Sequence, residues 1–146
     1  MKEGSAFILP KFITLSNKDN YNYLSVDSSN SLAFDKVLPD ANCTFEVSNL
    51  PYGRISLKGA NGKIINLSSY SGASSGWFRC EGNKGGCEFD VIYVKKDEIY
   101  LQSWSTPRFF MTDYQSDVYQ GLYAYPYADD HCLFIVSTPT GTSKET

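Results

Sequence analysis

Short runs in which apolar and polar residues alternate recur along the chain, and polar turns separate them. Alternation with a period of two is typical of strands that bury one face. In the first third of the chain such runs begin at Phe12, Tyr23 and Leu32, and turn residues such as 17–20 lie between them. The sequence keeps no sustained helical spacing in any window. The pattern therefore predicts a chain built from short β-strands.

This strand pattern occurs three times. The motif Cys-x-Phe-x-Val recurs at 43–47, 87–91 and 132–136, with spacings of 44 and 45 residues. Each copy closes a unit of four predicted strands. The strands expected before the motif are 12–15, 54–57 and 98–101 (first), 23–26, 64–67 and 109–112 (second), and 32–34, 77–79 and 122–124 (third).

Three units of four strands fill one domain. A propeller usually needs at least four blades, whereas three four-stranded units that close on one barrel form a β-trefoil. We therefore predict an all-β protein, a β-trefoil with pseudo-threefold symmetry, whose repeated Leu, Phe and Val positions form a shared core. The predicted domain spans 7–138, with repeats at about 11–50, 53–94 and 97–138, and a polar tail at 139–146.

Composition and charge narrow the class of protein. The 146 residues include 13 Lys and Arg and 16 Asp and Glu, which gives a formal charge of −3. A nucleic-acid partner usually requires a basic excess, so no nucleic acid is expected. Apolar runs fall short of the roughly 18–20 residues that cross a bilayer, and the apolar stretch 6–9 is too short for a signal peptide. We expect no membrane insertion and a cytoplasmic or nucleocytoplasmic location.

Three of the four cysteines, Cys43, Cys87 and Cys132, occupy equivalent places in the repeats. A reduced cysteine behaves as a small buried hydrophobe, and a cytosolic chain keeps its thiols reduced. We therefore predict three core thiols. Cys80 is separated from Cys87 by residues 81–86, so a hairpin disulfide is geometrically possible, but a reducing compartment disfavours it.

Residues for catalysis or metal binding are sparse. One His and no Cys-x2-Cys pair do not make a zinc site, and no cofactor is expected. His131 precedes Cys132, but neighbours on a strand point to opposite faces and do not form a nucleophile–base pair. We expect His131, Asp129 and Asp130 to lie in a solvated turn, and the protein not to be an enzyme. A hydrolase with an unrecognised site that uses His131 is the catalytic alternative.

Aromatic residues exceed what a core requires. Phe, Trp and Tyr make up 15% of the chain, and the third repeat carries Tyr114, Tyr119, Tyr123, Tyr125 and Tyr127. An exposed ring can stack on the apolar face of a sugar while nearby polar side chains bind its hydroxyls. The sequence therefore predicts a carbohydrate-binding lectin with a shallow pocket.

The candidate carbohydrate-binding residues divide by role into stacking rings and polar partners. The stacking candidates are Trp77, Tyr114 and Tyr119, and the polar candidates are Asp113, Asn20, Arg108 and Ser75. A further match, Gln102-Ser103-Trp104, has the Gln-x-Trp motif of ricin-type trefoil lectins. It occurs in one repeat and in a first strand, whereas in that family it lies near the end of a repeat, so we attribute it to chance.

The opening segment 8–15, then Tyr23-Leu24 and 43–47, resembles the amaranthin-type agglutinin domain of plants, as does Ile55-Ser56-Leu57 followed by Asn61-Gly62-Lys63. The likeness spans roughly 8–136. It implies a β-trefoil that binds N-acetylgalactosamine or the galactose–N-acetylgalactosamine disaccharide and is made without a signal peptide. The best-known member carries two trefoil domains per chain and binds sugar between the subunits of a dimer. For this one-domain chain a homodimer would supply avidity.

Glycans or glycoproteins are thus the expected partners. The alternative is a protein-binding β-trefoil, a cytoskeletal or inhibitor-like interaction module, because surfaces rich in Tyr, Ser, Gly and Asn also suit protein recognition. A heparin-binding trefoil would show a basic cluster, and the densest one, Lys95-Lys96, is followed by Asp97-Glu98. Sugar-dependent agglutination separates the lectin from a protein-binding module.

Overall fold

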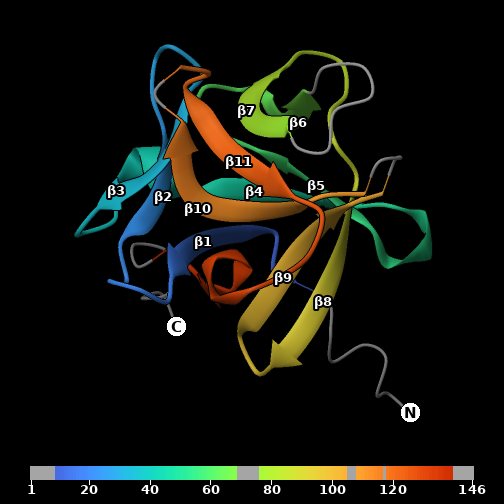
Figure 1. Ribbon diagram of the computed structural model, residues 1–146. Helices are drawn as coiled ribbons and strands as arrows, with labels where there is room; N and C mark the ends of the chain where they lie inside the picture. Colours follow the sequence, from blue (N-terminus) through green and yellow to red (C-terminus); the bar gives the residue numbers. More distant parts are fainter. Residues whose placement is uncertain (1–8, 69–75, 105–107, 117, 140–146) are drawn as a thin grey trace.

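The computed structural model describes residues 9–68, 76–104, 108–116 and 118–139 (Figure 1). The first four strands are β1 (Phe12–Asn17), β2 (Tyr23–Val26), β3 (Leu32–Lys36) and β4 (Phe45–Asn49). The next four are β5 (Ile55–Lys58), β6 (Ile64–Ser68), β7 (Gly76–Gly82) and β8 (Phe89–Lys95). The last four are β9 (Glu98–Ser103), β10 (Phe110–Ser116), β11 (Gly121–Tyr125) and β12 (Phe134–Ser137).

Helical structure in these ranges is limited to short 3-10 turns. They are η2 (Ala41–Cys43), η3 (Pro51–Gly53) and η4 (Asp130–Cys132). Across the described residues, no helix has the length and apolar character needed to span a membrane.

Six of the strands close into a barrel. β1 pairs with β4, β4 with β5, β5 with β8, β8 with β9, β9 with β12, and β12 returns to β1, all antiparallel. The other six form the hairpins β2–β3, β6–β7 and β10–β11, one from each set of four strands (Figure 1). Six barrel strands and three hairpins are the β-trefoil that the repeats predict.

The core is built from the repeated apolar positions. Full burial of one Leu or Phe side chain contributes roughly 1.5–3 kcal/mol, so equivalent positions supply equivalent shares of the stability. Val47 and Val136 are also buried, and Val91 packs partly buried against the same cluster. The first-strand Leu and the motif Phe are fully buried in all three repeats: Leu15, Leu57, Leu101, Phe45, Phe89 and Phe134.

The fourth strand of each repeat begins later than the sequence predicts. The motif suggested strands that start at its cysteine, whereas β4, β8 and β12 start at its phenylalanine. In the first and third repeats the cysteine instead ends a 3-10 turn. An Asp at the start of each turn, Asp40 or Asp129, accepts a backbone N–H and caps the turn, which postpones the strand.

All four cysteines are free and buried, so the predicted core thiols at Cys43, Cys87 and Cys132 are confirmed and Cys80 forms no disulfide. Burial raises the pKa of Cys80 to about 11, that of Cys87 to about 12 and that of Cys132 to about 11. The thiolate is the reactive form of cysteine. At neutral pH these three thiols are therefore poor nucleophiles.

Candidate functional site

An irregularity in β10 changes the direction in which the side chains of Asp113 and Tyr114 point. The register between β10 and β11 shifts within β10, so that the strand bulges at 112–114. The buried Thr112 fixes this bulge, because its Oγ1 donates to the carbonyl of Tyr123 at 2.9 Å and accepts from the N–H of Tyr114 at 3.1 Å. A bulge breaks the alternation of a regular strand. Asp113 and Tyr114 are therefore presented toward η4, which packs against β10.

The carboxylate of Asp113 is held by side chains from distant parts of the chain. Its Oδ2 accepts from Nδ2 of Asn17 at 3.1 Å, and its Oδ1 lies 3.1 Å from Nδ1 of His131. The Asp113 side chain is only 8% exposed. Burial raises the pKa of this carboxyl, while His131 and Asn17 act in the opposite direction. An oriented and partly desolvated carboxylate is thus set against the imidazole.

This contact determines which hydrogen-bonding role the imidazole has. A carboxylate oxygen accepts, so the proton of neutral His131 is placed on Nδ1 by its contact with Asp113. The other ring nitrogen, Nε2, is then an acceptor. A ligand hydroxyl can donate to it.

Asn17 also organises the turn between β1 and β2. The buried side chain accepts through Oδ1 from the backbone N–H of Asn20 at 3.4 Å and of Asn22 at 3.2 Å. Tyr21 lies between them with a φ of 61° and is 60% exposed. One amide therefore ties this turn to Asp113.

Aromatic rings form a row beside the imidazole. The Tyr114 ring centroid lies 4.2 Å from that of His131 and 5.8 Å from that of Tyr125, which lies 6.4 Å from Tyr127. Tyr114 is 39% exposed and Tyr127 is 67% exposed. Desolvation, followed by the neighbouring carboxylates, raises the pKa of Tyr114, so its hydroxyl stays protonated at neutral pH. The row offers ring surface next to hydrogen-bonding groups.

A pocket of about 380 Å³ opens between the β1–β2 turn and η4. This volume lies within the range of small-molecule sites. At its edge, the ammonium of Lys18 is 3.1 Å from the carboxylate of Glu98. Within the described ranges, no three His, Cys, Asp or Glu side chains gather to hold a metal ion. The pocket is lined by Lys18, Asp19, Asp130, His131 and Leu133.

Comparison with known proteins identifies the fold of the chain. No family model matches the chain, and no curated protein matches it in sequence. Solved structures do match. The designed 3-fold symmetric protein ThreeFoil is 12% identical, with a TM-score of 0.72 over 89% of this chain and 100% of its own. The fold is a β-trefoil.

Two further trefoils among these structures are described with saccharides. SeviL bound to asialo-GM1 saccharide has a TM-score of 0.67 at 12% identity, over 89% of this chain and 98% of its own. The ricin B-like lectin of Macrolepiota procera, in complex with lactose, has a TM-score of 0.65 at 8% identity, over 88% of this chain and 95% of its own. At such low identity the likeness establishes the shared arrangement of strands.

The trefoil brings together three of the seven predicted site residues. Asp113 and Tyr114 adjoin the pocket through His131, and Asn20 lies in the turn that borders it. Arg108 lies apart from them and forms an ion pair with a carboxylate of β8. Ser75 lies outside the described residues.

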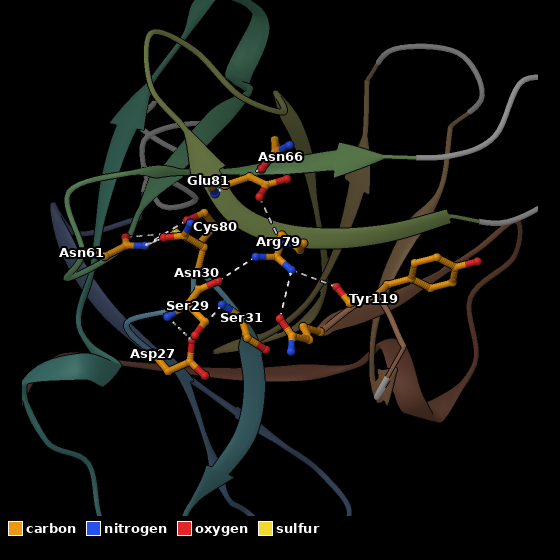
Figure 2. A network of polar contacts seen from close by, with 11 residues as sticks. Asp27, Ser29, Asn30, Ser31, Asn61, Asn66, Arg79, Cys80, Glu81 and Tyr119 are labelled. Carbon is orange, nitrogen blue, oxygen red and sulfur yellow. Dashed lines mark hydrogen bonds and ion pairs between the residues drawn. The ribbon is translucent and has the colours of Figure 1, made fainter.

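Trp77 and Tyr119 meet each other rather than the pocket residues. Their ring centroids are 3.9 Å apart and their planes differ by 8°, so each ring covers one face of the other. Figure 2 shows how Tyr119 is held, since Nη1 of Arg79 donates to its carbonyl at 3.0 Å. The two predicted stacking candidates thus form a separate aromatic pair.

Arg79 links all three repeats (Figure 2). From β7 its Nη2 donates to the carbonyl of Ser29 in the β2–β3 turn at 2.6 Å, and its Nη1 reaches Tyr119 in the β10–β11 turn. Its Nε lies 3.1 Å from a carboxylate oxygen of Glu81. Asp27 fixes the first turn by accepting from the N–H of Ser29 at 2.8 Å. Arg79 is therefore a structural clasp, because it donates to backbone carbonyls of the two other repeats.

The prediction that His131 lies in a solvated turn is only partly correct. Asp129 caps the turn by accepting from the backbone N–H of His131 at 2.9 Å, as a polar turn requires. The imidazole, however, packs on Tyr114 and binds Asp113, because the β10 bulge places both beside it. The sequence does not indicate the contact between Asn17 and Asp113, because the two residues lie 96 positions apart and no motif links them.

Proposed function

We propose that the chain is a lectin, a non-enzymatic module that binds the terminal sugars of glycans or glycoproteins in the pocket beside His131. One observation carries the proposal: His131 lines the pocket, and its Nδ1 lies 3.1 Å from a carboxylate oxygen of Asp113. In the neutral ring this contact leaves Nε2 as an acceptor. Two trefoils of similar architecture are described with bound saccharides, which supports this class of ligand.

The pocket has the mixed chemistry that a pyranose requires. Sugar hydroxyls both donate and accept hydrogen bonds, while the C–H groups of the ring offer an apolar face. The ammonium of Lys18 can donate, and the carboxylates of Asp19 and Asp130 can accept together with His131. The exposed part of Tyr114 supplies aromatic surface.

Galactose- or N-acetylgalactosamine-type glycans are the proposed ligands within this class. The resemblance of 8–15 and 43–47 to amaranthin-type agglutinins supports this choice, as do the lactose and the asialo-GM1 saccharide of the two trefoils. Single sugar sites bind weakly, so useful avidity requires a second site or a homodimer.

Isothermal titration of Tyr114 variants tests the proposed pocket. Losing an aromatic contact costs about 0.5–1.5 kcal/mol, which is about a 2- to 12-fold loss of affinity. Tyr114→Ala should weaken the binding of lactose or N-acetylgalactosamine by this factor, and Tyr114→Phe, which keeps the ring, should weaken it less. Equal affinities would place the sugar elsewhere. If folded wild type binds neither sugar, the result favours the alternative function, a protein-binding β-trefoil, and a pull-down would then search for a protein partner.

A further inference from the structure

Tyr52 is held in a conformation that its type disfavours. It lies in η3 with φ 66° and ψ 25°, and the residue is 87% exposed. The left-handed region is unfavourable for a bulky residue and is usually occupied by Gly, Asn or Asp. Burial of the ring does not offset this cost. Strained residues of this kind are frequent at functional sites. Tyr21, in the turn beside the His131 pocket, likewise has a positive φ and is exposed.

Four side chains next to this turn form alternating layers of rings and cations. The guanidinium carbon of Arg54 lies 5.2 Å from the ring centroid of Tyr52 and 3.4 Å from that of Trp104. Arg108 lies 5.4 Å from the same indole and forms an ion pair with Asp90. Trp104 is 45% exposed. The layers fix the aromatic surface in place before any ligand arrives.

The guanidinium of Arg54 is held more by stacking and charge than by hydrogen bonds. Its Nε is buried and makes no hydrogen bond within the described residues. The nearest carboxylate oxygens lie 3.8 Å away on Asp90 and 4.0 Å away on Glu88, beyond the length of a direct hydrogen bond. Glu88 is 49% exposed. The guanidinium of Arg54 and the carboxylate of Glu88 can therefore still form hydrogen bonds with a ligand near the exposed ring of Tyr52.

We propose that this surface, defined by Tyr52, Arg54, Glu88 and Trp104, is a second saccharide site that takes an uncharged pyranose. The proposal rests on the proposed lectin function. Two arginines face two carboxylates here, so the local charge is balanced and favours a neutral ligand. Tyr52 provides the stacking face, Arg54 the donors and Glu88 the acceptors. None of these residues lines the His131 pocket, so the chain would be bivalent without a homodimer.

Chemical-shift mapping on the whole chain separates the two sites. The ¹⁵N-labelled protein is titrated to saturation with lactose, N-acetylgalactosamine, N-acetylglucosamine and mannose, each separately. For at least one sugar, the Trp104 indole and the amides of residues 52–54 should shift together, in addition to the amides near His131. The Tyr52→Asn variant should lose the first set of shifts and keep the second.

The Tyr52→Asn variant separates a role in binding from a role in folding. Asn tolerates the left-handed region, so Tyr52→Asn should melt no lower than wild type while its second site disappears. Tyr52→Phe, which keeps the ring, should retain at least half of the saturating shift. Shifts confined to the His131 region would overturn the second site and leave the lectin function in place. A lower melting temperature for Tyr52→Asn would show that Tyr52 is structural. The absence of shifts with all four sugars would contradict both proposals.

Discussion

Replacing Asp113 with Asn changes the hydrogen-bonding role of His131 without changing the shape of the site. Asn17 donates to one carboxylate oxygen, so the amide oxygen of Asn at 113 must take that position. Its NH₂ group then faces Nδ1 of His131 and needs an acceptor there. The imidazole proton moves to Nε2. The ring of His131 now presents a donor where the wild type presents an acceptor.

The structure predicts a large effect of Asp113→Asn on sugar binding and a small effect on folding. A ligand group left facing a mismatched partner costs about 1–3 kcal/mol, which corresponds to about a 5- to 150-fold loss of sugar affinity. Folding should change by less, within about 1 kcal/mol, because both contacts of residue 113 persist in neutral form. Burial of Asp113 also disfavours its charge in the wild type, and the amide removes this cost.

The pH dependence of stability has a defined sign. Since the folded-state pKa of Asp113 is raised above 3.8, its contribution to stability is fully present below that pH and is lost as the pH rises through the folded-state pKa. The wild type should therefore gain stability relative to Asp113→Asn as the pH falls from 7 toward 4.

Urea unfolding at several pH values and isothermal titration with lactose or N-acetylgalactosamine measure the two effects. Asp40→Asn is the matched control, because it makes the same substitution at a residue outside the pocket. Asp40 caps η2, the turn of the first repeat that is equivalent to η4, and Asn caps as well as Asp. This control should bind like wild type. Unchanged affinity of Asp113→Asn would refute the assigned role of His131. A loss of several kcal/mol of stability would show that the carboxylate serves folding instead.

Three further experiments test what stabilises the fold. Arg79→Ala should cost about 2–4 kcal/mol in urea unfolding, because two charge-assisted bonds to backbone carbonyls are lost; a change below 1 kcal/mol would contradict its role as a clasp. Gly121→Ala places a Cβ 2.2 Å from a carbonyl oxygen and should cost about 1–3 kcal/mol, whereas Gly85→Ala, with open space around it, should be neutral. The buried cysteines should not react with a thiol reagent at pH 8 until the chain unfolds, when four thiols become titratable; rapid labelling of native protein would contradict their burial.

The fold could be predicted because the sequence repeats its core. Leu15, Leu57 and Leu101 recur at nearly constant spacing and are fully buried, so periodicity identified both the strands and the threefold closure. Local capping was harder to foresee. Asp129 and its counterpart in the first repeat delay the fourth strands by accepting backbone N–H groups, an effect that an apolar pattern does not encode.

The site could be predicted only in part, because it depends on barrel closure and on one bulge. Asp113 and Tyr114 were identified from the excess of aromatic and polar residues in the third repeat, but their partner His131 was assigned to solvent. Regular alternation in β10 would have pointed Asp113 elsewhere, and the bulge depends on the buried hydroxyl of Thr112. Composition indicated the chemistry of the site, and tertiary packing decided which residues share it.

A glycan array probed in parallel with the untagged wild-type chain and with Asp113→Asn tests whether Asp113 and His131 organise a sugar site. Wild type should give selective signal on neutral glycans that end in galactose or N-acetylgalactosamine, and the variant should lose that signal. No signal from folded, concentrated wild type, or equal signal from both proteins, would contradict a sugar site organised by Asp113 and His131.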